Sequence, residues 1–255
     1  IEEIRLFLPK LLRGDAAELQ RFRGRRITAV RRRGKMLLLS SENDRHLLFH
    51  LKMTGQFHWA KKGVPRDAAT HLAISFRDLD HELRFRDVRK FGFLRCLETA
   101  SLFDCEELRY LGPEPLELDD PAFPGLFARR KGRLKSLLLN QSFLAGIGNI
   151  YADEILFEAG LHPLTPASRL SKKEIGRLWD AIRRILKKAV VAGGSTVRDY
   201  KDADGRDGLF QNDHRVYGRK GLPCPRCGAY VRRLVIGGRA SFFCPRCQRK
   251  KAGKN

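Results

Sequence analysis

The segment Cys224-Pro225-Arg226-Cys227 recurs as Cys244-Pro245-Arg246-Cys247, and this repeat decides how the C-terminal part of the chain folds. Sixteen residues separate the two pairs. Two Cys-x2-Cys pairs at this spacing are typical of a tetrahedral zinc site, in which each pair places two thiolates on one side of a tight turn. Apolar residues over 230–236 and 241–243 predict two strands joined at Gly237-Gly238. The sequence therefore predicts a zinc ribbon with one structural Zn²⁺, because four thiolates leave no open coordination position.

Two disulfides in a secreted module are the alternative for these four cysteines. No apolar segment of the kind found in signal peptides follows the first residues, and disulfides are rare in the cytosol. We therefore favour zinc and a cytoplasmic protein. Cys96 and Cys105 are expected to be ordinary, partly buried thiols.

The charge balance points to a polyanionic partner. The chain of 255 residues has 51 Lys and Arg against 29 Asp and Glu, a formal net charge of +22. Residues 214–255 contain twelve Lys or Arg and no acidic residue. An acidic disordered tail is excluded, as is a neutral enzyme without a charged partner, and 42% apolar residues suffice for a core. Nucleic acid is the first expectation and an anionic membrane surface the second, although no apolar run approaches the ~18 residues that span a bilayer.

The order of the predicted elements indicates an α+β protein in three parts. Residues 1–112 are expected to form an antiparallel β-sandwich or barrel, with strands near 26–30, 35–40, 46–51, 71–76, 82–85 and 92–97. Residues 113–215 begin with a proline-rich boundary and hold helices near 133–140 and 150–159. A third helix opens at the capping box Ser171–Glu174 and ends at Gly193-Gly194, before a loop over 195–215. Residues 216–255 are the ribbon.

Four segments could carry chemistry, and each has a plain structural reading as well. Ala145–Tyr151 is either a tight turn between helices or a phosphate site at a helix N-terminus, with Asn149 as the expected N-cap. Arg31–Lys35 is either a solvated strand entry or a basic contact. Met53, in His50–Gly55, is more often a core residue than a functional one. Asp87–Gly92 is either a simple hairpin or a loop whose Arg and apolar wedge fill space inside a duplex.

Taken in order, these segments form a specific set. It comprises Arg32–Lys35, His50–Gly55, Asp87–Gly92, Leu111–Leu116, Gly146–Glu154, Gly193–Thr196, Val216–Arg219 and the ribbon ending at Gly238–Cys244. Over nearly its whole length the chain closely resembles the bacterial formamidopyrimidine-DNA glycosylase family. The resemblance implies a base-flipping DNA repair enzyme with a helix–two-turns–helix domain. Such an enzyme removes 8-oxoguanine and formamidopyrimidines from double-stranded DNA and cuts the abasic strand by β,δ-elimination.

The resemblance also implies roles for individual residues. Lys35 resembles the family's strand lysine near the abasic-site phosphate, assigned to β-elimination, and Arg239 resembles the ribbon arginine assigned to δ-elimination. The gap left by the flipped base would be filled by Met53, Arg89 and Phe91, with Arg89 facing the orphaned cytosine.

Further DNA contacts are implied elsewhere in the chain. Asn149 matches a phosphate-binding asparagine, and Arg130 and Lys135 are further basic candidates. His71 stands where the family often has two histidines. The loop that folds over the extruded base would contain Ser195, Thr196, Val197, Arg198 and Tyr200.

The beginning of the chain departs from the family pattern. The family starts with Pro-Glu-Leu-Pro-Glu, whose proline amine attacks the sugar and forms a Schiff base, with the glutamate as the acid. This chain starts with Ile1-Glu2-Glu3 and contains no such segment. Either the segment lies upstream of residue 1, or the protein is a non-catalytic relative that binds damaged DNA. A third alternative is an enzyme whose substrates are oxidised pyrimidines, as in the endonuclease VIII branch of the family. In each case we expect a monomer in the bacterial cytoplasm, associated with the nucleoid.

Overall fold

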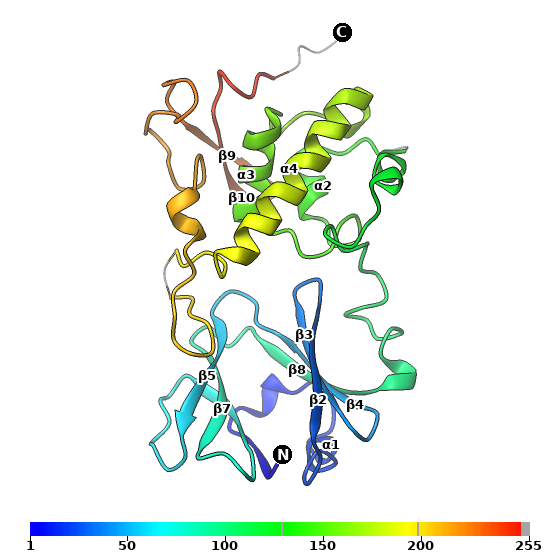
Figure 1. The fold of residues 1–255 in the computed structure, drawn as a ribbon, viewed down its shortest axis with the longest axis vertical. Coiled ribbons are helices and arrows are strands. Elements are labelled where there is room, and N and C mark those ends of the chain that lie inside the picture. Colours follow the sequence, from blue (N-terminus) through cyan, green and yellow to red (C-terminus); the bar gives the residue numbers. More distant parts are fainter. Residues whose placement is uncertain (129, 198, 251–255) are drawn as a thin grey trace. The chain divides into compact units, whose positions relative to one another are not determined.

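The structure, a computed structural model, describes residues 1–128, 130–197 and 199–250. Contacts divide the chain into two compact units (Figure 1). The first unit contains residues 1–109 and 195–208, and the second contains residues 110–194 and 209–255. The three-part division drawn from the sequence stays a prediction, and the contacts differ from it for residues 195–208, which they group with the first unit.

The first unit is an antiparallel β-sandwich. One sheet has the order β1 (Glu3–Leu6), β6 (Thr70–Ser75), β7 (His81–Asp87), β5 (Gly55–Lys61). The other has the order β2 (Ile27–Arg33), β3 (Met36–Ser41), β4 (Arg45–His50), β8 (Phe93–Glu98), and a short helix, α1, covers Ala17–Gln20. The ring of Phe49 in the second sheet lies 4.9 Å from that of Phe57 and 6.0 Å from that of Phe85 in the first. Aromatic packing between the inner faces therefore closes the sandwich.

The register of the second sheet brings distant loops to one end of the sandwich. Met36 pairs with His50, and His50 pairs with Phe93, so these residues form one row across β3, β4 and β8. The turn at Gly34-Lys35 precedes this row, the segment 51–54 follows it, and the segment 88–92 leads into it. Three loops far apart in the sequence thus emerge side by side.

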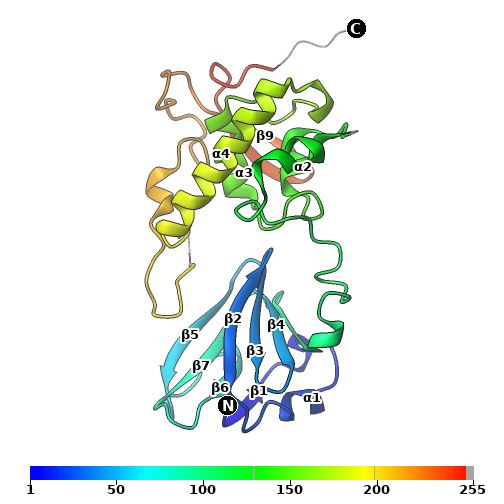
Figure 2. The same ribbon diagram turned by 45° about the vertical axis from the view of Figure 1, so that its right-hand side comes forward.

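The second unit is built on three helices, α2 (Leu134–Leu139), α3 (Asn149–Ala159) and α4 (Lys172–Val191). Ser171 and Glu174 form the expected capping box at the start of α4, and Gly193 and Gly194 follow its end with positive φ. The apolar face of α4, with Leu178, Ile182 and Ile185, is buried against α3, in a core that α2 also joins. In both views of the ribbon, α3 lies between α4 and the C-terminal strands (Figures 1 and 2).

The C-terminal ribbon consists of β9 (Arg232–Ile236) and β10 (Arg239–Phe243), joined by the expected turn at Gly237-Gly238. Side chains of α3 attach β10 to the helix. The Asn149 Nδ2 donates to the Ala240 carbonyl at 3.0 Å, and the Phe242 N–H donates to the Asp153 carboxylate at 3.0 Å. Four helical residues rise by about 6 Å and two strand residues by about 6.6 Å, so the two spacings match. This match sets the position of β10 along α3.

Glu154 attaches a second segment to the same helix. Its buried carboxylate accepts the backbone N–H groups of residues 215, 216 and 217 at 2.8–3.0 Å. Burial raises the pKa of Glu154, and the three N–H donors oppose that shift. A side chain that satisfies three backbone donors holds the segment leading into the ribbon.

The fold class expected from the sequence is confirmed, with a sandwich, helices and a ribbon in the expected order. The six expected strands of the first unit are present within a few residues. The sequence analysis does not predict β1 and β5, and β5 begins at Gly55, the last residue of the His50–Gly55 segment. Among the described residues, no helix is long and apolar enough to cross a membrane.

Candidate functional site

Met53, Arg89 and Phe91 form an exposed cluster at the end of the sandwich described above, which we call the tip cluster. The side chains of Met53 and Phe91 are 73% and 54% exposed. The Arg89 Nη1 lies 3.0 Å from the Met53 sulfur, and its guanidinium lies 4.8 Å from the centre of the Phe91 ring. The tip cluster therefore combines two exposed apolar side chains with one cation, and the structure brings together the three residues that the family resemblance grouped.

Asp87, at the end of β7, holds the two loops that carry the tip cluster. Its carboxylate is fully buried and accepts the Thr54 hydroxyl at 2.5 Å, the Arg89 N–H at 3.2 Å and the Gly92 N–H at 2.7 Å. The Arg89 N–H also approaches the Thr54 hydroxyl at 3.2 Å. One carboxylate thus ties the 51–54 loop to the 88–92 loop. Charged acceptors make the stronger hydrogen bonds, so this link is rigid.

The backbone of both loops is tightly turned. Lys52 and Lys90 have φ values of 54° and 57°, a left-handed conformation that costs energy for a residue with a side chain. A Cβ at Gly92 would lie 2.7 Å from the Phe85 ring and 3.1 Å from the Asp87 carboxylate. Only glycine therefore lets the 88–92 loop close over Asp87.

Lys35 lies in the two-residue turn between β2 and β3, next to Gly34 with φ of 57°, and its side chain is exposed. His50 stands close by in the adjacent strand. Burial, followed by the charges of Lys52, Lys35 and Arg13, lowers the pKa of His50 to about 4. The Lys52 N–H donates to the His50 Nδ1 at 2.8 Å. His50 is therefore neutral at neutral pH and adds no positive charge beside Lys35.

His71, expected from the resemblance to contact DNA, is 3% exposed, and its Nε2 lies 2.8 Å from the Asp87 carbonyl oxygen. Because the ring is buried under the tip loops, it cannot reach a ligand outside the protein. We correct the expectation: His71 is a buried residue that forms a hydrogen bond with the Asp87 backbone and so helps to hold Asp87 in place.

In the second unit, Arg239 begins β10 with an exposed side chain, and Arg130 is exposed before α2, its guanidinium 5.9 Å from the Phe143 ring centre. Asn149 is the first residue of α3 and not its N-cap. The N-cap is Gly148, and no side chain caps the helix there. The Asn149 amide is instead bonded to β10, so the expected capping role is wrong.

Lys135, expected to be a DNA contact, is 0% exposed. Its Nζ lies 2.5 Å from Asp153 and 3.2 Å from the Asn149 carbonyl oxygen. Burial lowers the pKa of Lys135 and raises that of Asp153 to about 6, while the attraction within the pair opposes both shifts. The ammonium holds α2, α3 and β10 together, so we correct this expectation and leave Lys135 out of the proposed DNA contacts.

The loop over 195–208 is attached to β5, an edge strand. The Trp59 N–H donates to the Ala203 carbonyl at 3.1 Å, and the Lys201 N–H donates to the Gln56 side chain at 3.3 Å. The Thr196 hydroxyl donates to the Tyr200 carbonyl at 2.8 Å and accepts the Gly208 N–H at 2.9 Å, which closes the loop. Val197 and Tyr200 are 51% and 42% exposed, and Ser195 begins the loop. Arg198, also expected here, lies outside the described residues.

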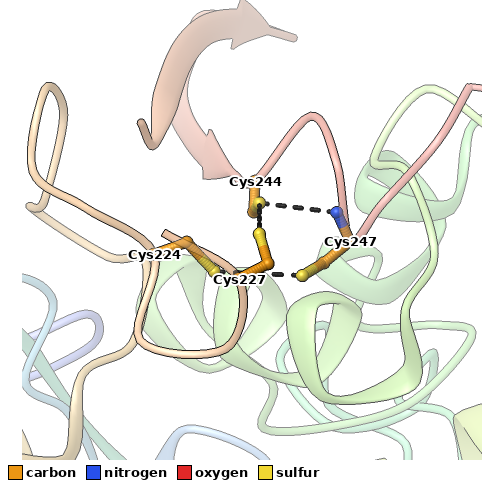
Figure 3. A group of neighbouring side chains, drawn as sticks. All are labelled: Cys224, Cys227, Cys244 and Cys247. Carbon is orange, nitrogen blue, oxygen red and sulfur yellow. Dashed lines mark hydrogen bonds between the residues drawn. The ribbon is translucent and has the colours of Figure 1, made fainter. Parts of the chain in front are cut away.

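The two Cys-Pro-Arg-Cys segments, which we call the zinc knuckles, bring their four cysteine side chains together (Figure 3). Their sulfurs all lie within 4.8 Å of one another, and two pairs are separated by 3.4 Å and 3.9 Å. A Zn–S bond of about 2.3 Å requires sulfurs about 3.8 Å apart at the corners of a tetrahedron. The residues Cys224, Cys227, Cys244 and Cys247 therefore fit one structural Zn²⁺, as the spacing predicts.

Polar contacts join the zinc knuckles to the C-terminal end of α3 and the residues that follow it. Gln248 accepts the Cys244 N–H and donates to the Leu161 carbonyl, both at 2.9 Å. The Arg226 guanidinium lies over the Phe157 ring at 4.5 Å and donates to the Phe157 carbonyl at 3.2 Å. The zinc site thus stabilises the same helix that positions β10 and Arg239.

Several of these supporting residues have no signal in the sequence alone. Asp87 and Thr54 lie in segments that the sequence singles out, but their link across 33 residues depends on the sandwich. Asp153 and Glu154 read as ordinary polar residues of a helix. The structure buries both of them.

Comparison with known proteins gives three matches to family models. Residues 1–94 match the formamidopyrimidine-DNA glycosylase N-terminal domain, residues 111–201 the formamidopyrimidine-DNA glycosylase H2TH domain, and residues 221–249 the zinc finger found in FPG and IleRS. The three models follow one another along the chain.

Curated relatives and solved structures agree with these matches. The formamidopyrimidine-DNA glycosylase of Solibacter usitatus is 44% identical, and the alignment covers 94% of this chain and 89% of that protein. That of Thermus thermophilus is 46% identical over 88% of this chain and 83% of that protein. A structure of Lactococcus lactis Fpg with DNA containing an abasic site is similar with a TM-score of 0.91 and 35% identity, covering 98% of this chain and 92% of that one.

Replacing Asp87 tests the link between the tip loops. In Asp87→Asn one carboxylate oxygen becomes an NH₂ group, so a buried acceptor is lost. We expect the free energy that keeps the two loops closed to fall by about 1–3 kcal/mol. We expect amide hydrogen exchange in residues 51–56 and 88–93 to accelerate about 5- to 100-fold, as mass spectrometry of peptides would show. Asp78→Asn, which removes the same charge at an exposed site of the same unit, is the matched control. Unchanged exchange in both loops would contradict the assigned role.

Removing the metal tests the zinc site. The purified protein should contain one zinc per chain, and chelation should expose the backbone amides of residues 221–249 to exchange, because the ribbon folds around its metal. The core between α2 and α4 should keep its protection. Cys244→Ser should reproduce the effect, whereas Cys105→Ser should bind zinc normally. A metal-free protein with an intact ribbon would contradict a structural role.

Proposed function

The chain belongs to the formamidopyrimidine-DNA glycosylase family, and we propose that it excises oxidised purines from double-stranded DNA and then nicks the abasic strand. The observation that carries the proposal is the tip cluster on its Asp87 support. An enzyme that acts on a base must take the base out of the stack. The tip cluster has the shape and chemistry needed to occupy the space left behind.

We assign the filling of that space to Met53 and Phe91, whose apolar side chains replace lost stacking. The Arg89 guanidinium offers several donors to the base left without a partner, which the family resemblance makes a cytosine. The rigid support strengthens binding, because loops that become ordered only on binding lose conformational entropy, and this loss lowers the affinity. Asp87, Thr54 and Gly92 provide that order before DNA arrives.

Three residues outside the tip cluster are proposed to bind phosphates. Arg130 and Arg239 are exposed in the second unit, and Asn149 lies at the start of α3, where backbone N–H groups and the helix dipole favour an anion. The net charge of +22 supports this assignment. Affinity should therefore depend strongly on salt, because each phosphate contact releases counterions.

The chemistry proposed for the chain follows the family. An amine adds to the sugar carbon as the base leaves, and the resulting Schiff base acidifies the neighbouring C–H bond. We assign the β-elimination step to Lys35 and the δ-elimination step to Arg239. The Zn²⁺ takes no part in the reaction and supports the ribbon that carries Arg239.

We assign the loop over 195–208 to covering the extruded base, with Tyr200 and Val197 as its apolar surface. Solved relatives that are named as complexes with Fapy-dG containing DNA favour purine lesions over the pyrimidine alternative. We place the protein, as a monomer, in the bacterial cytoplasm and on the nucleoid.

Borohydride trapping tests the proposed activity. Protein produced from its natural translation start should form a covalent adduct with a duplex containing 8-oxoguanine opposite cytosine, and should release the products of β,δ-elimination. Arg239→Ala should stop the reaction largely after β-elimination, with the adduct still formed. An absence of any adduct, together with equal affinity for damaged and intact duplex, would overturn the proposal.

The same protein allows a separate check of phosphate binding. Arg130→Ala should lower the slope of log affinity against log salt by about 1. Arg177→Ala, which removes an exposed arginine from α4, should leave the slope unchanged.

A further inference from the structure

The tip cluster contains a methionine, Met53, that is largely exposed. The chain has two methionines. Met36 lies in β3 and is 8% exposed, whereas Met53 is 73% exposed. The Met53 sulfur also lies 3.0 Å from the Arg89 Nη1. Met53 is thus the more exposed of the two methionines, and its sulfur contacts the Arg89 guanidinium of the tip cluster.

From this arrangement we infer that Met53 is a site of reversible oxidation that weakens lesion binding. This inference rests on the function proposed above for the tip cluster. It adds a modification site, and it makes the protein that acts on oxidised bases sensitive to the same class of oxidant.

The oxidant is a hydroperoxide. The Met53 sulfur attacks one peroxide oxygen with a lone pair, an S–O bond forms and the O–O bond breaks. The departing hydroxide takes the proton of the new S–OH group, so hydrogen peroxide yields the sulfoxide and one water. Sulfur is oxidised by two electrons and the peroxide is reduced by two. A methionine sulfoxide reductase reverses the step, with two thiols oxidised to a disulfide and the oxygen released as water.

Accessibility separates the two methionines. Attack on a peroxide needs an open approach to sulfur, and Met36 is enclosed between neighbouring strands, paired with Arg33 on one side and His50 on the other. Met53 stands on the 51–54 loop, 73% exposed, with Arg89 as the neighbour of its sulfur. We expect Met53 to be oxidised well before Met36.

The consequence follows from the change in polarity. A thioether is a weak acceptor, whereas a sulfoxide oxygen is a strong one. The sulfoxide of Met53 would hold the Arg89 guanidinium, which must otherwise be available to the unpaired base. A polar S–O group must also lose its hydration to enter the base stack. Both effects weaken binding, and the Asp87 support is unaffected.

The experiment compares binding before and after oxidation. The protein is treated with hydrogen peroxide, and peptides carrying Met53 and Met36 are compared by mass spectrometry. Affinity for a duplex with a tetrahydrofuran abasic site is then measured by fluorescence anisotropy. We expect Met53 to gain one oxygen first, and binding to weaken about 3- to 30-fold. Methionine sulfoxide reductase should restore both.

Two variants separate Met53 from other targets, the zinc thiolates above all. Met53→Leu and Met36→Leu are treated in the same way, each is compared with its own untreated sample, and zinc release is followed with a metal-binding dye. Met36→Leu should lose affinity as the parent does. Met53→Leu should keep the affinity it had before treatment.

Three outcomes would overturn the inference alone. These are equal oxidation rates for the two methionines, an equal loss of affinity in Met53→Leu, and complete oxidation of Met53 without a change in affinity. An untreated protein that does not prefer the abasic duplex over intact DNA would instead overturn the proposed function, and the inference with it.

Discussion

The structure depends on buried carboxylates that accept hydrogen bonds from the backbone and from hydroxyls. Asp87 joins the two tip loops, Asp153 attaches β10 to α3, and Glu154 holds the segment that leads into the ribbon. In each case one side chain connects segments that are far apart in the sequence. Since an unpaired buried charge is costly, every such contact must form for the fold to be stable. These buried residues therefore position the exposed side chains to which we assign DNA contacts.

This arrangement explains how a strongly basic chain can hold its exposed side chains in defined positions. The functional assignments fall on exposed cations and apolar side chains, whereas the acids beneath them are buried and bonded. The Arg89 N–H is bonded to the Asp87 carboxylate, and Arg239 begins the strand that is bonded to Asp153. Because the backbone is fixed from inside, the exposed side chains can meet DNA with little loss of entropy. The zinc site adds a second, independent support for β10 through its contacts with the end of α3.

Features with local causes could be predicted from the sequence. The cysteine spacing, the turn at Gly237-Gly238 and the capping box at Ser171 each depend on a few neighbouring residues, and each is confirmed. Burial of Lys135 and His71 could not be predicted, because the acceptors that make it possible come from other elements. The capping expectation for Asn149 was wrong for a similar reason, since its amide bonds to a strand about ninety residues later. Lysine and histidine read as surface cations until the fold supplies their partners.

The central claim is that the tip cluster enters the duplex at the damaged site. Photo-crosslinking tests it most directly, with a benzophenone side chain introduced in place of Phe91 and a duplex carrying one abasic site opposite a cytosine. The account predicts a crosslink to that cytosine or its immediate neighbours, and much less crosslinking to an intact duplex of the same sequence. Equal crosslinking to both duplexes, or crosslinks spread along the DNA, would contradict it.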